Sequence, residues 1–215
     1  MRNLKFAPGE YYHVYNRGVD HRQIVEDEYD SERFLLALKL FNSTQPIGSI
    51  KDFLLANDNI VVPPAETLVD IICYCLNPNH YHFILFEKVE GGLSAFMKRF
   101  GGYSYYFNLR HERTGSLFEG TFKAKHIVSN EHLLHASGYV NLNDQVHGLH
   151  GSTSKLVRSS WNEYKTGSNG LCKKEIIIEQ FGNHKEYEKF AMGNLPDMKA
   201  IRKTYKELKG TLALD

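Results

Sequence analysis

The sequence predicts an α+β fold built on one antiparallel sheet, and the order of its elements carries that prediction. Between residues 11 and 143 the apolar patterning indicates strand, helix, strand, strand, helix, strand and then a further helix. This is the split β-α-β order of a ferredoxin-like sandwich, in which both helices of the repeat pack on one face of the sheet. The other face is expected to hold a ligand or the additional helix.

The first predicted strand and helix lie before residue 42. Tyr11–Asn16 combines aromatic and β-branched side chains and ends at an Arg-Gly pair, which indicates a strand. Ser31–Phe41 has apolar residues at helical spacing, and Ser31 is the expected N-cap. Residues 42–67 contain several prolines and are expected to form a loop with a short helix near residues 51–56.

A hairpin is the clearest local signal in the chain. Two apolar runs, Leu68–Leu76 and Tyr81–Glu87, are separated by Asn77-Pro78-Asn79, whose residue types favour a turn. The elements expected after it are a helix over Leu93–Leu109, a strand over Phe122–Val128, a helix over Asn130–Asn143 capped by Ser129 or Asn130, and two helices over Lys174–Phe181 and Asp197–Lys209.

Length and composition favour one domain with an extension. The chain has 215 residues, of which 42% are hydrophobic, and we expect a core domain over residues 1–165 and a helical extension over residues 166–215. Three cysteines without a CxxC pair predict no disulfide framework. The first ten residues lack an apolar signal core, and no run approaches the ~20 apolar residues of a membrane span. We therefore expect a soluble, cytoplasmic protein without a membrane partner.

Charge is segregated along the chain rather than large overall. The formal net charge is +1, yet residues 97–126 hold six lysines and arginines against two glutamates, a local charge of +4. Such a run is typical of a nucleic-acid-binding face, although a solvated helix face explains it equally well. The candidate phosphate contacts are Arg17, Lys98, Arg99, Lys123 and Lys125.

Two histidines of the hairpin form a candidate metal site. His80 and His82 lie two residues apart on a predicted strand, so both imidazoles project from the same face. That arrangement offers two nitrogens to one metal ion. Two histidines at this spacing can also be ordinary polar surface.

The predicted helix over Asn130–Asn143 supplies further candidates. Tyr139 and Asn143 are four residues apart and hence neighbours on a helix. A hydroxyl nucleophile beside an amide oxygen ligand suits metal-assisted phosphoryl chemistry, whereas the alternative is an amphipathic tyrosine at the edge of the core. Gly138 costs the helix about 1 kcal/mol against alanine, which indicates either close approach of another backbone or a break in the helix.

The same hairpin admits a structural zinc site as an alternative. If Cys75 pairs with His80 and Cys73 with His82 across the turn, two thiolates and two imidazoles would surround one ion. This hypothesis depends on the register of the hairpin, because a slip of one residue turns the side chains to the other face.

The motifs together resemble a known family. The string from Asn77 to Leu85, with His80 and His82 flanking an aromatic residue, resembles the metal-binding motif of the HUH endonucleases, and more narrowly that of the REP-associated tyrosine transposases and related single-strand insertion-sequence transposases. Four other segments resemble parts of that family and occur in the family's order along the chain. Tyr12 to Gly18 is similar to its first strand, and Gly115 to Lys123 is similar to its Gly-x-Leu-Trp-x-Gly-Arg-Phe-Lys segment. Tyr139 to Asn143 is similar to its Tyr-x-x-x-Asn helix, and Ser159-Ser160-Trp161 with Tyr164 is similar to its Ser-Ser-Tyr stretch. Asp144, Phe118 and Thr121 stand where the family usually has Pro, Trp and Arg.

The resemblance implies an activity and its residues. It implies that residues 1–165 form an HUH nuclease domain, that His80, His82 and Asn143 bind one Mg²⁺ or Mn²⁺, and that Tyr139 attacks DNA to form a 5′-phosphotyrosine. The expected partner is single-stranded DNA with hairpins, and the expected state is a monomer or a homodimer. The reaction would cut and later rejoin the strand.

Two other functions stay open from the sequence. A ferredoxin-like sheet with exposed aromatics also occurs in modules that bind nucleic acid without cutting it. A rolling-circle replication initiator would share the paired histidines. The binding module would need aromatics rather than histidines on its open sheet face and would not need Tyr139, and the initiator is disfavoured by the transposase-like segments.

Overall fold

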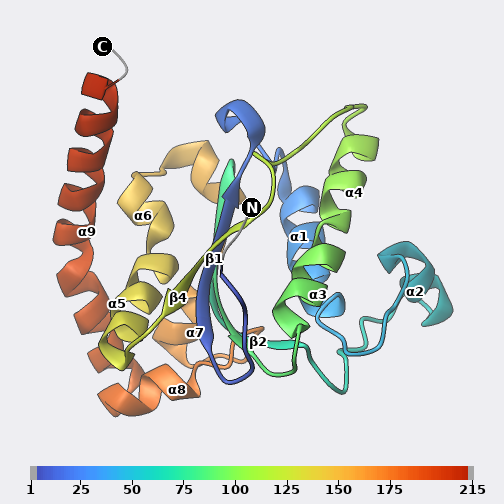
Figure 1. The fold of residues 1–215 in the computed structure, drawn as a ribbon, viewed down its shortest axis with the longest axis horizontal. Helices are drawn as coiled ribbons and strands as arrows, with labels where there is room; N and C mark the ends of the chain where they lie inside the picture. Colours follow the sequence, from blue (N-terminus) through green and yellow to red (C-terminus); the bar gives the residue numbers. More distant parts are fainter. Residues whose placement is uncertain (1–3, 213–215) are drawn as a thin grey trace.

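The computed structural model describes residues 4–212 and confirms the α+β prediction. Its centre is a five-stranded antiparallel sheet in the order β4-β1-β3-β2-β5 (Figure 1). The first four strands have the arrangement of a ferredoxin-like sandwich, because the fourth strand returns to pair with the first. The strands are β1 (Tyr11–Arg17), β2 (Val69–Asn77), β3 (His80–Glu87), β4 (Lys123–Ile127) and β5 (Arg158–Ser159).

One face of the sheet is covered by α1 (Glu28–Leu40), α3 (Gly92–Phe100) and α4 (Gly102–Arg110), while α2 (Ile50–Ala56) lies to the side in the loop region (Figure 1). The single helix expected over Leu93–Leu109 is wrong, because the helical structure is interrupted at Gly101, which separates α3 from α4. Consecutive glycines have low helix propensity, and the break occurs there.

The start of α1 also differs from the prediction. Its N-cap is Asp27, whose Oδ1 accepts the backbone N–H of Asp30 at 3.0 Å. Ser31 lies inside the helix and is buried, and its hydroxyl donates to the carbonyl of Leu156 at 3.0 Å. An aspartate four residues earlier supplies the capping oxygen, so the serine side chain is released for a contact with a distant loop.

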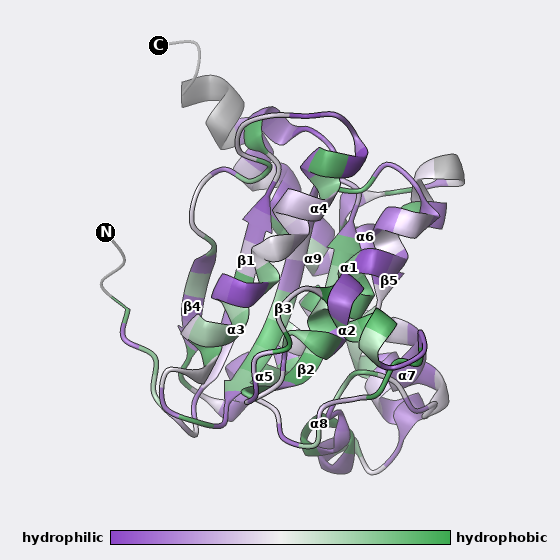
Figure 2. Ribbon diagram, turned by 90° about the vertical axis from the view of Figure 1, so that its right-hand side faces the viewer, coloured by the Kyte–Doolittle hydropathy of each residue, from purple (hydrophilic) through white to green (hydrophobic). Residues whose placement is uncertain are grey.

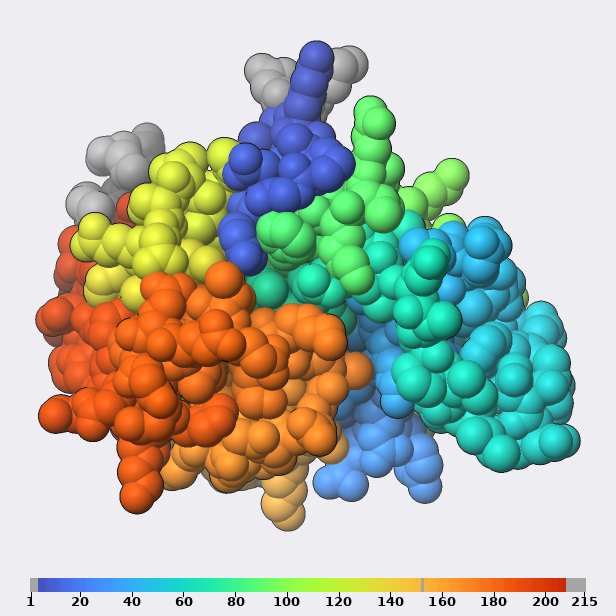
Figure 3. All heavy atoms as spheres, turned by 90° about the horizontal axis from the view of Figure 1, so that it is seen from below, coloured from blue at the N-terminus to red at the C-terminus, as the bar shows by residue number. Residues whose placement is uncertain are grey.

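The second face carries the additional helices. They are α5 (Asn130–Asn141), α6 (Asn143–His147), α7 (Trp161–Thr166), α8 (Glu175–Ile178) and α9 (His184–Leu212). Short 3₁₀ turns lie elsewhere in the chain as well: Val19–His21 follows β1, Gly151–Leu156 contacts α1, and Glu179–Phe181 follows α8. α5 lies against β2 and β3, and α9 lies along α5, α6 and α7. Figure 3 shows the C-terminal part of the chain, in orange and red, packed on the side of the molecule opposite α2.

The core lies between the sheet and these two helical layers. Figure 2 shows apolar residues concentrated along the central strands β2 and β3. On β1 buried and partly buried residues alternate, so Tyr12 and Val14 enter the core while His13 and Tyr15 project toward the side of α5. Within residues 4–212 no helix has the length and apolar character needed to cross a membrane.

Candidate active site

The floor of the site is a row of polar side chains that crosses the sheet. His80 lies opposite Arg17 of β1 and opposite Asn77 of β2, and His82 lies opposite Tyr15 of β1. The rings of His80 and His82 have centroids 5.4 Å apart, and their planes are nearly perpendicular. The hairpin register thus places both imidazoles on the face that α5 and α6 cover.

The roof of the site comes from α5 and α6. The Tyr139 ring meets the His82 ring edge to face, with centroids 5.6 Å apart. The continuous helix expected through Asn143 is wrong: α5 ends at Asn141, and Asn143 is the first residue of α6. The backbone N–H of Leu142 still bonds to the carbonyl of Gly138, so Asn143 remains about one turn beyond Tyr139 and over the sheet.

The atoms around His80 form a donor set suited to a cation. Asn79 Oδ1 lies 2.7 Å from His80 Nδ1, and since that oxygen accepts, Nδ1 carries the proton and Nε2 presents a lone pair. His80 Nε2 lies 3.0 Å from Asn143 Oδ1, which is also an acceptor. Two acceptors at this separation repel each other unless a hydrogen-bond donor or a cation approaches both. Asn77 Nδ2 makes that approach, at 2.9 Å from His80 Nε2 and 2.7 Å from Asn143 Oδ1.

His82 completes the set. Its Nδ1 lies 2.8 Å from Nε2 of His13, a residue of β1. When His82 donates through Nδ1, its Nε2 lone pair is available to a metal, and His13 fixes the orientation of the ring. Two imidazole nitrogens and one amide oxygen are donors that fit a divalent ion with open coordination positions. Within the part of the chain that the structure describes, no group of three or more His, Cys, Asp or Glu could hold a metal, so the set depends on the asparagine.

Burial keeps the histidines of the site neutral. It lowers the pKa of His80 to about 4 and the pKa of His13 to about 4, and it lowers the pKa of His82 well below the ordinary value. A histidine that binds a metal must be unprotonated, so these imidazoles are ready at neutral pH.

The Tyr139 phenol is partly buried, and burial raises its pKa above the ordinary value of a tyrosine. The neighbouring Asn143 amide and the positive charge of Arg202 act in the opposite direction and favour the phenolate. The tyrosine is therefore protonated in the free protein at neutral pH. Its activation requires a further positive charge close to its oxygen.

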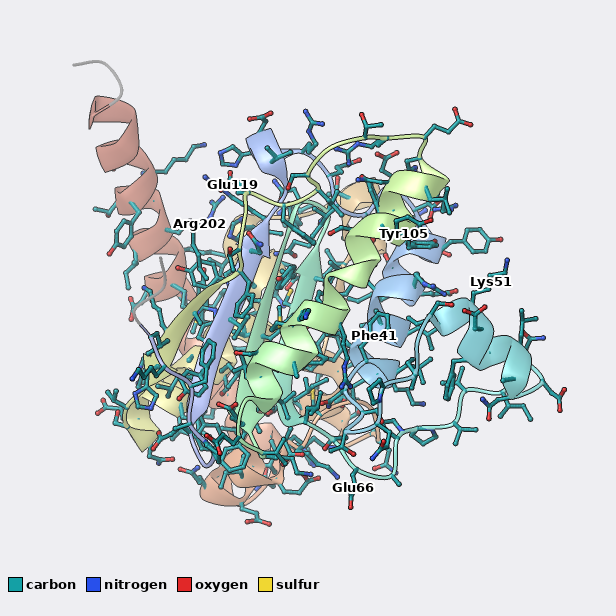
Figure 4. All side chains as sticks on the ribbon, turned by 45° about the vertical axis from the view of Figure 1, so that its right-hand side comes forward. Phe41, Lys51, Glu66, Tyr105, Glu119 and Arg202 are labelled. Carbon is teal, nitrogen blue, oxygen red and sulfur yellow. The ribbon has the colours of Figure 1, made fainter. Side chains whose placement is uncertain are left out.

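A cationic cleft of about 570 Å³ opens beside these residues. His80 and His82 form part of its wall, and Arg202 of α9 (labelled in Figure 4) also lines it. The remaining lining residues are Tyr15, Asn16, Arg17, His21, Asn79, Lys123, His147 and Lys206. The lining residues include Lys and Arg but no carboxylate, which makes the cleft suitable for a polyanion.

The five basic residues predicted to contact phosphate fall in different places. Arg17 and Lys123 line the cleft, and Arg17 also pairs with Glu119 at 2.5 Å. Lys98 lines a second hollow of about 480 Å³ on the other face of the sheet, next to α3. Arg99 donates a hydrogen bond to the carbonyl of Ser43, and neither hollow includes it. Lys125 is exposed on β4, opposite His13.

The alternative zinc site is excluded by the hairpin register. Cys75 lies opposite His82, and Asn77 rather than a cysteine lies opposite His80. Cys73 lies opposite Ile84, after an irregularity in β2. Burial raises the pKa of both thiols, so neither forms a thiolate readily. The expected pairing was two residues off at each histidine.

Several residues of the site were missed by sequence reasoning. His13 has a detectable signal, because the alternation of β1 puts it on the same face as Tyr15. His147 has one too, since it follows Asn143 by four residues, and its ring centroid lies 4.4 Å from that of His80. Arg202 had no local signal, because its place depends on how α9 packs.

Comparisons with known proteins find a likeness among solved structures alone. No family model matches the chain, and no curated protein matches its sequence. Among solved structures, the chain is similar to a REP-associated tyrosine transposase bound to a REP hairpin, with 14% sequence identity and a TM-score of 0.47. The match covers 80% of this chain and 88% of the other. That protein belongs to the family which the ordered sequence motifs resemble.

Proposed function

We propose that this protein cuts and rejoins single-stranded DNA through a covalent bond between Tyr139 and a 5′ phosphate. His80, His82 and Asn143 would hold one Mg²⁺ or Mn²⁺, and the substrate would be a single strand beside a hairpin. A divalent ion bound there supplies positive charge that polarises the scissile phosphate and orients it.

The bond changes follow from a tyrosine nucleophile. The Tyr139 phenol loses its proton, and its oxygen attacks the phosphorus in line with the bond to the 3′ oxygen. That bond breaks, the 3′ oxygen takes a proton, and a phosphotyrosine diester remains on the 5′ side. Because the new diester keeps the energy of the original linkage, a 3′ hydroxyl can attack it and restore the strand.

One observation carries the proposal: the Tyr139 ring lies against His82, and Asn143 meets His80, at two histidines that line the cationic cleft. Three other tyrosines could serve as nucleophile, Tyr103, Tyr105 and Tyr106, but they belong to α4, on the other face of the sheet. Tyr103 is buried and donates its hydroxyl to the carbonyl of Ile24, while Tyr105 is 74% exposed and points outward (Figure 4).

The test is a cleavage assay with end-labelled hairpin oligonucleotides taken from the flanks of the gene. With Mn²⁺ or Mg²⁺ we expect a protease-sensitive adduct that carries a 3′ label but not a 5′ label, because the protein stays on the 5′ phosphate. The adduct should disappear in Tyr139→Phe and persist in the matched control Tyr105→Phe.

Three outcomes would contradict the proposal. An adduct that survives Tyr139→Phe would assign the nucleophile to another tyrosine. A label on the other fragment would reverse the polarity of the cut. Tight binding without an adduct, across many sequences and both metals, would identify a nucleic-acid-binding module instead.

A further inference from the structure

One face of α9 changes character along its length. Its first half turns buried apolar side chains toward α5 and α7, and its second half turns positive side chains into the cleft. Successive members of this stripe are three or four residues apart, so they lie on one side of the helix. They are Tyr187, Ala191, Leu195, Met198, Arg202 and Lys206.

The position of this stripe is set by contacts with the helix that carries Tyr139. The Tyr187 hydroxyl is bonded to Ser137 Oγ at 3.0 Å and to Asn141 Nδ2 at 2.8 Å. At Gly138 a Cβ atom would lie 3.7 Å from the Cα of Ala191, so the two helices approach closely. Because α9 is held against α5 at these points, its continuation reaches the cleft at a defined place.

The charge of Arg202 is available to a ligand. Its Nη2 lies 3.3 Å from Nδ1 of His147, and no carboxylate in residues 4–212 forms an ion pair with it. By contrast, Lys203 on the neighbouring side of α9 faces Glu207, 3.9 Å away. Lys123 is exposed on the edge strand β4 and lines the same cleft.

We propose that Arg202 and Lys206 of α9, with Lys123 of β4, form a phosphate clamp that holds the single strand on either side of the linkage cut by Tyr139. The two α9 residues are about 6 Å apart along the helix axis, comparable to the spacing of successive phosphates on an extended strand. The planar guanidinium of Arg202 suits two-point contact with a phosphate, whereas Lys206 acts as a point charge. This inference rests on the proposed function.

The experiment measures binding without cleavage. In a Tyr139→Phe background with a chelator, fluorescence anisotropy follows the binding of a hairpin-flanked single strand as NaCl is raised. Each phosphate contact to a single strand contributes ~0.7 to the slope of log K against log salt concentration. We expect Arg202→Gln and Lys206→Gln each to reduce the slope by ~0.7, and both together by ~1.4.

Two further variants separate charge from packing. Arg202→Lys keeps the charge and should keep the slope, while the matched control Lys203→Gln removes one charge from the other side of α9 and should leave the slope unchanged. The clamp is refuted if the slopes of Arg202→Gln and Lys206→Gln equal that of Lys203→Gln. Equal slopes would refute the clamp even if Tyr139 forms the covalent adduct with DNA.

The result is independent of the tyrosine chemistry. If the unmodified protein forms no adduct but the two slopes fall, the clamp is supported and the proposed nuclease activity is wrong. If the unmodified protein forms the adduct and the slopes fall, the rate of adduct formation should also drop in Arg202→Gln, because the scissile phosphate is then less firmly held.

Discussion

Replacing Tyr187 by phenylalanine tests how α9 is attached to the helix that carries the candidate nucleophile. Tyr187 is fully buried, and its hydroxyl contacts Ser137 Oγ and Asn141 Nδ2 at 3.0 and 2.8 Å. Asn141 Oδ1 in turn accepts the hydroxyl of Ser160 at 2.6 Å, so the phenol is one member of a buried polar network. Tyr187→Phe keeps the ring and removes only the oxygen.

The expected cost can be worked out from these bonds. The Ser137 hydroxyl keeps its bond to the carbonyl of Leu134, so it stays satisfied. The Asn141 amide loses its only hydrogen-bond acceptor among the described residues and remains buried. Leaving a buried donor unpaired costs about 1–3 kcal/mol, and losing the second hydrogen bond adds about 1 kcal/mol. We therefore expect the free energy of unfolding to fall by about 2–4 kcal/mol.

The assay is urea unfolding followed by circular dichroism, with Tyr205→Phe as the matched control. Tyr205 lies on the same helix and is 66% exposed, so its hydroxyl should contribute little. The melting temperature should fall by about 2–4 °C for each kcal/mol in a chain of this size. If Tyr187→Phe costs less than about 0.5 kcal/mol, or no more than the control, the buried network does not hold α9 in place.

Two further predictions concern a helix contact and an ion pair. Gly138→Ala should leave the free energy of unfolding unchanged or raise it by up to about 1 kcal/mol, because the added methyl meets its neighbours at ordinary contact distances of 3.4–3.7 Å and alanine favours a helix. Gly138→Leu should instead lower it by about 1–3 kcal/mol in the same urea assay, by forcing α9 away from α5; equal stability of the two variants would show that the helices can separate freely. The hydrogen bond from Arg110 holds the pKa of Asp27 below its usual range. The interaction therefore stabilises the folded protein fully at pH values above the pKa of Asp27 in the unfolded chain, and this stabilisation is lost as the pH falls through the pKa of Asp27 in the folded protein. Arg110→Met should therefore destabilise the protein at pH 7, and the difference should shrink below about pH 4 in thermal melts taken across pH; a difference that stays constant down to pH 2 would contradict this.

The hairpin and its two histidines could be predicted from the sequence because their cause is local. Alternation along a strand determines which side chains share a face, and the Asn-Pro-Asn turn determines where the strand reverses. His80 and His82 therefore had to project together. The order of strands and helices likewise followed from periodicity, and the sheet order confirms it.

Errors arose where two local signals competed. Asp27 and Ser31 both have the chemistry of an N-cap, and only the structure shows that the aspartate caps α1. The apolar spacing over residues 93–109 continued through Gly101, and periodicity alone did not reveal the break. In the hairpin, the cysteine and histidine pairing failed by a shift of register, which sequence spacing does not determine.

Contacts between distant elements were decided by the tertiary structure alone. His13 meets His82 across 69 residues of sequence, and Arg202 meets His147 across 55. Local patterning determined which faces of the strands and helices are apolar, and it placed the two histidines together. Which elements share the cleft depended on how the helices pack over the sheet, because close packing of side chains far apart in the sequence selects the position of α9.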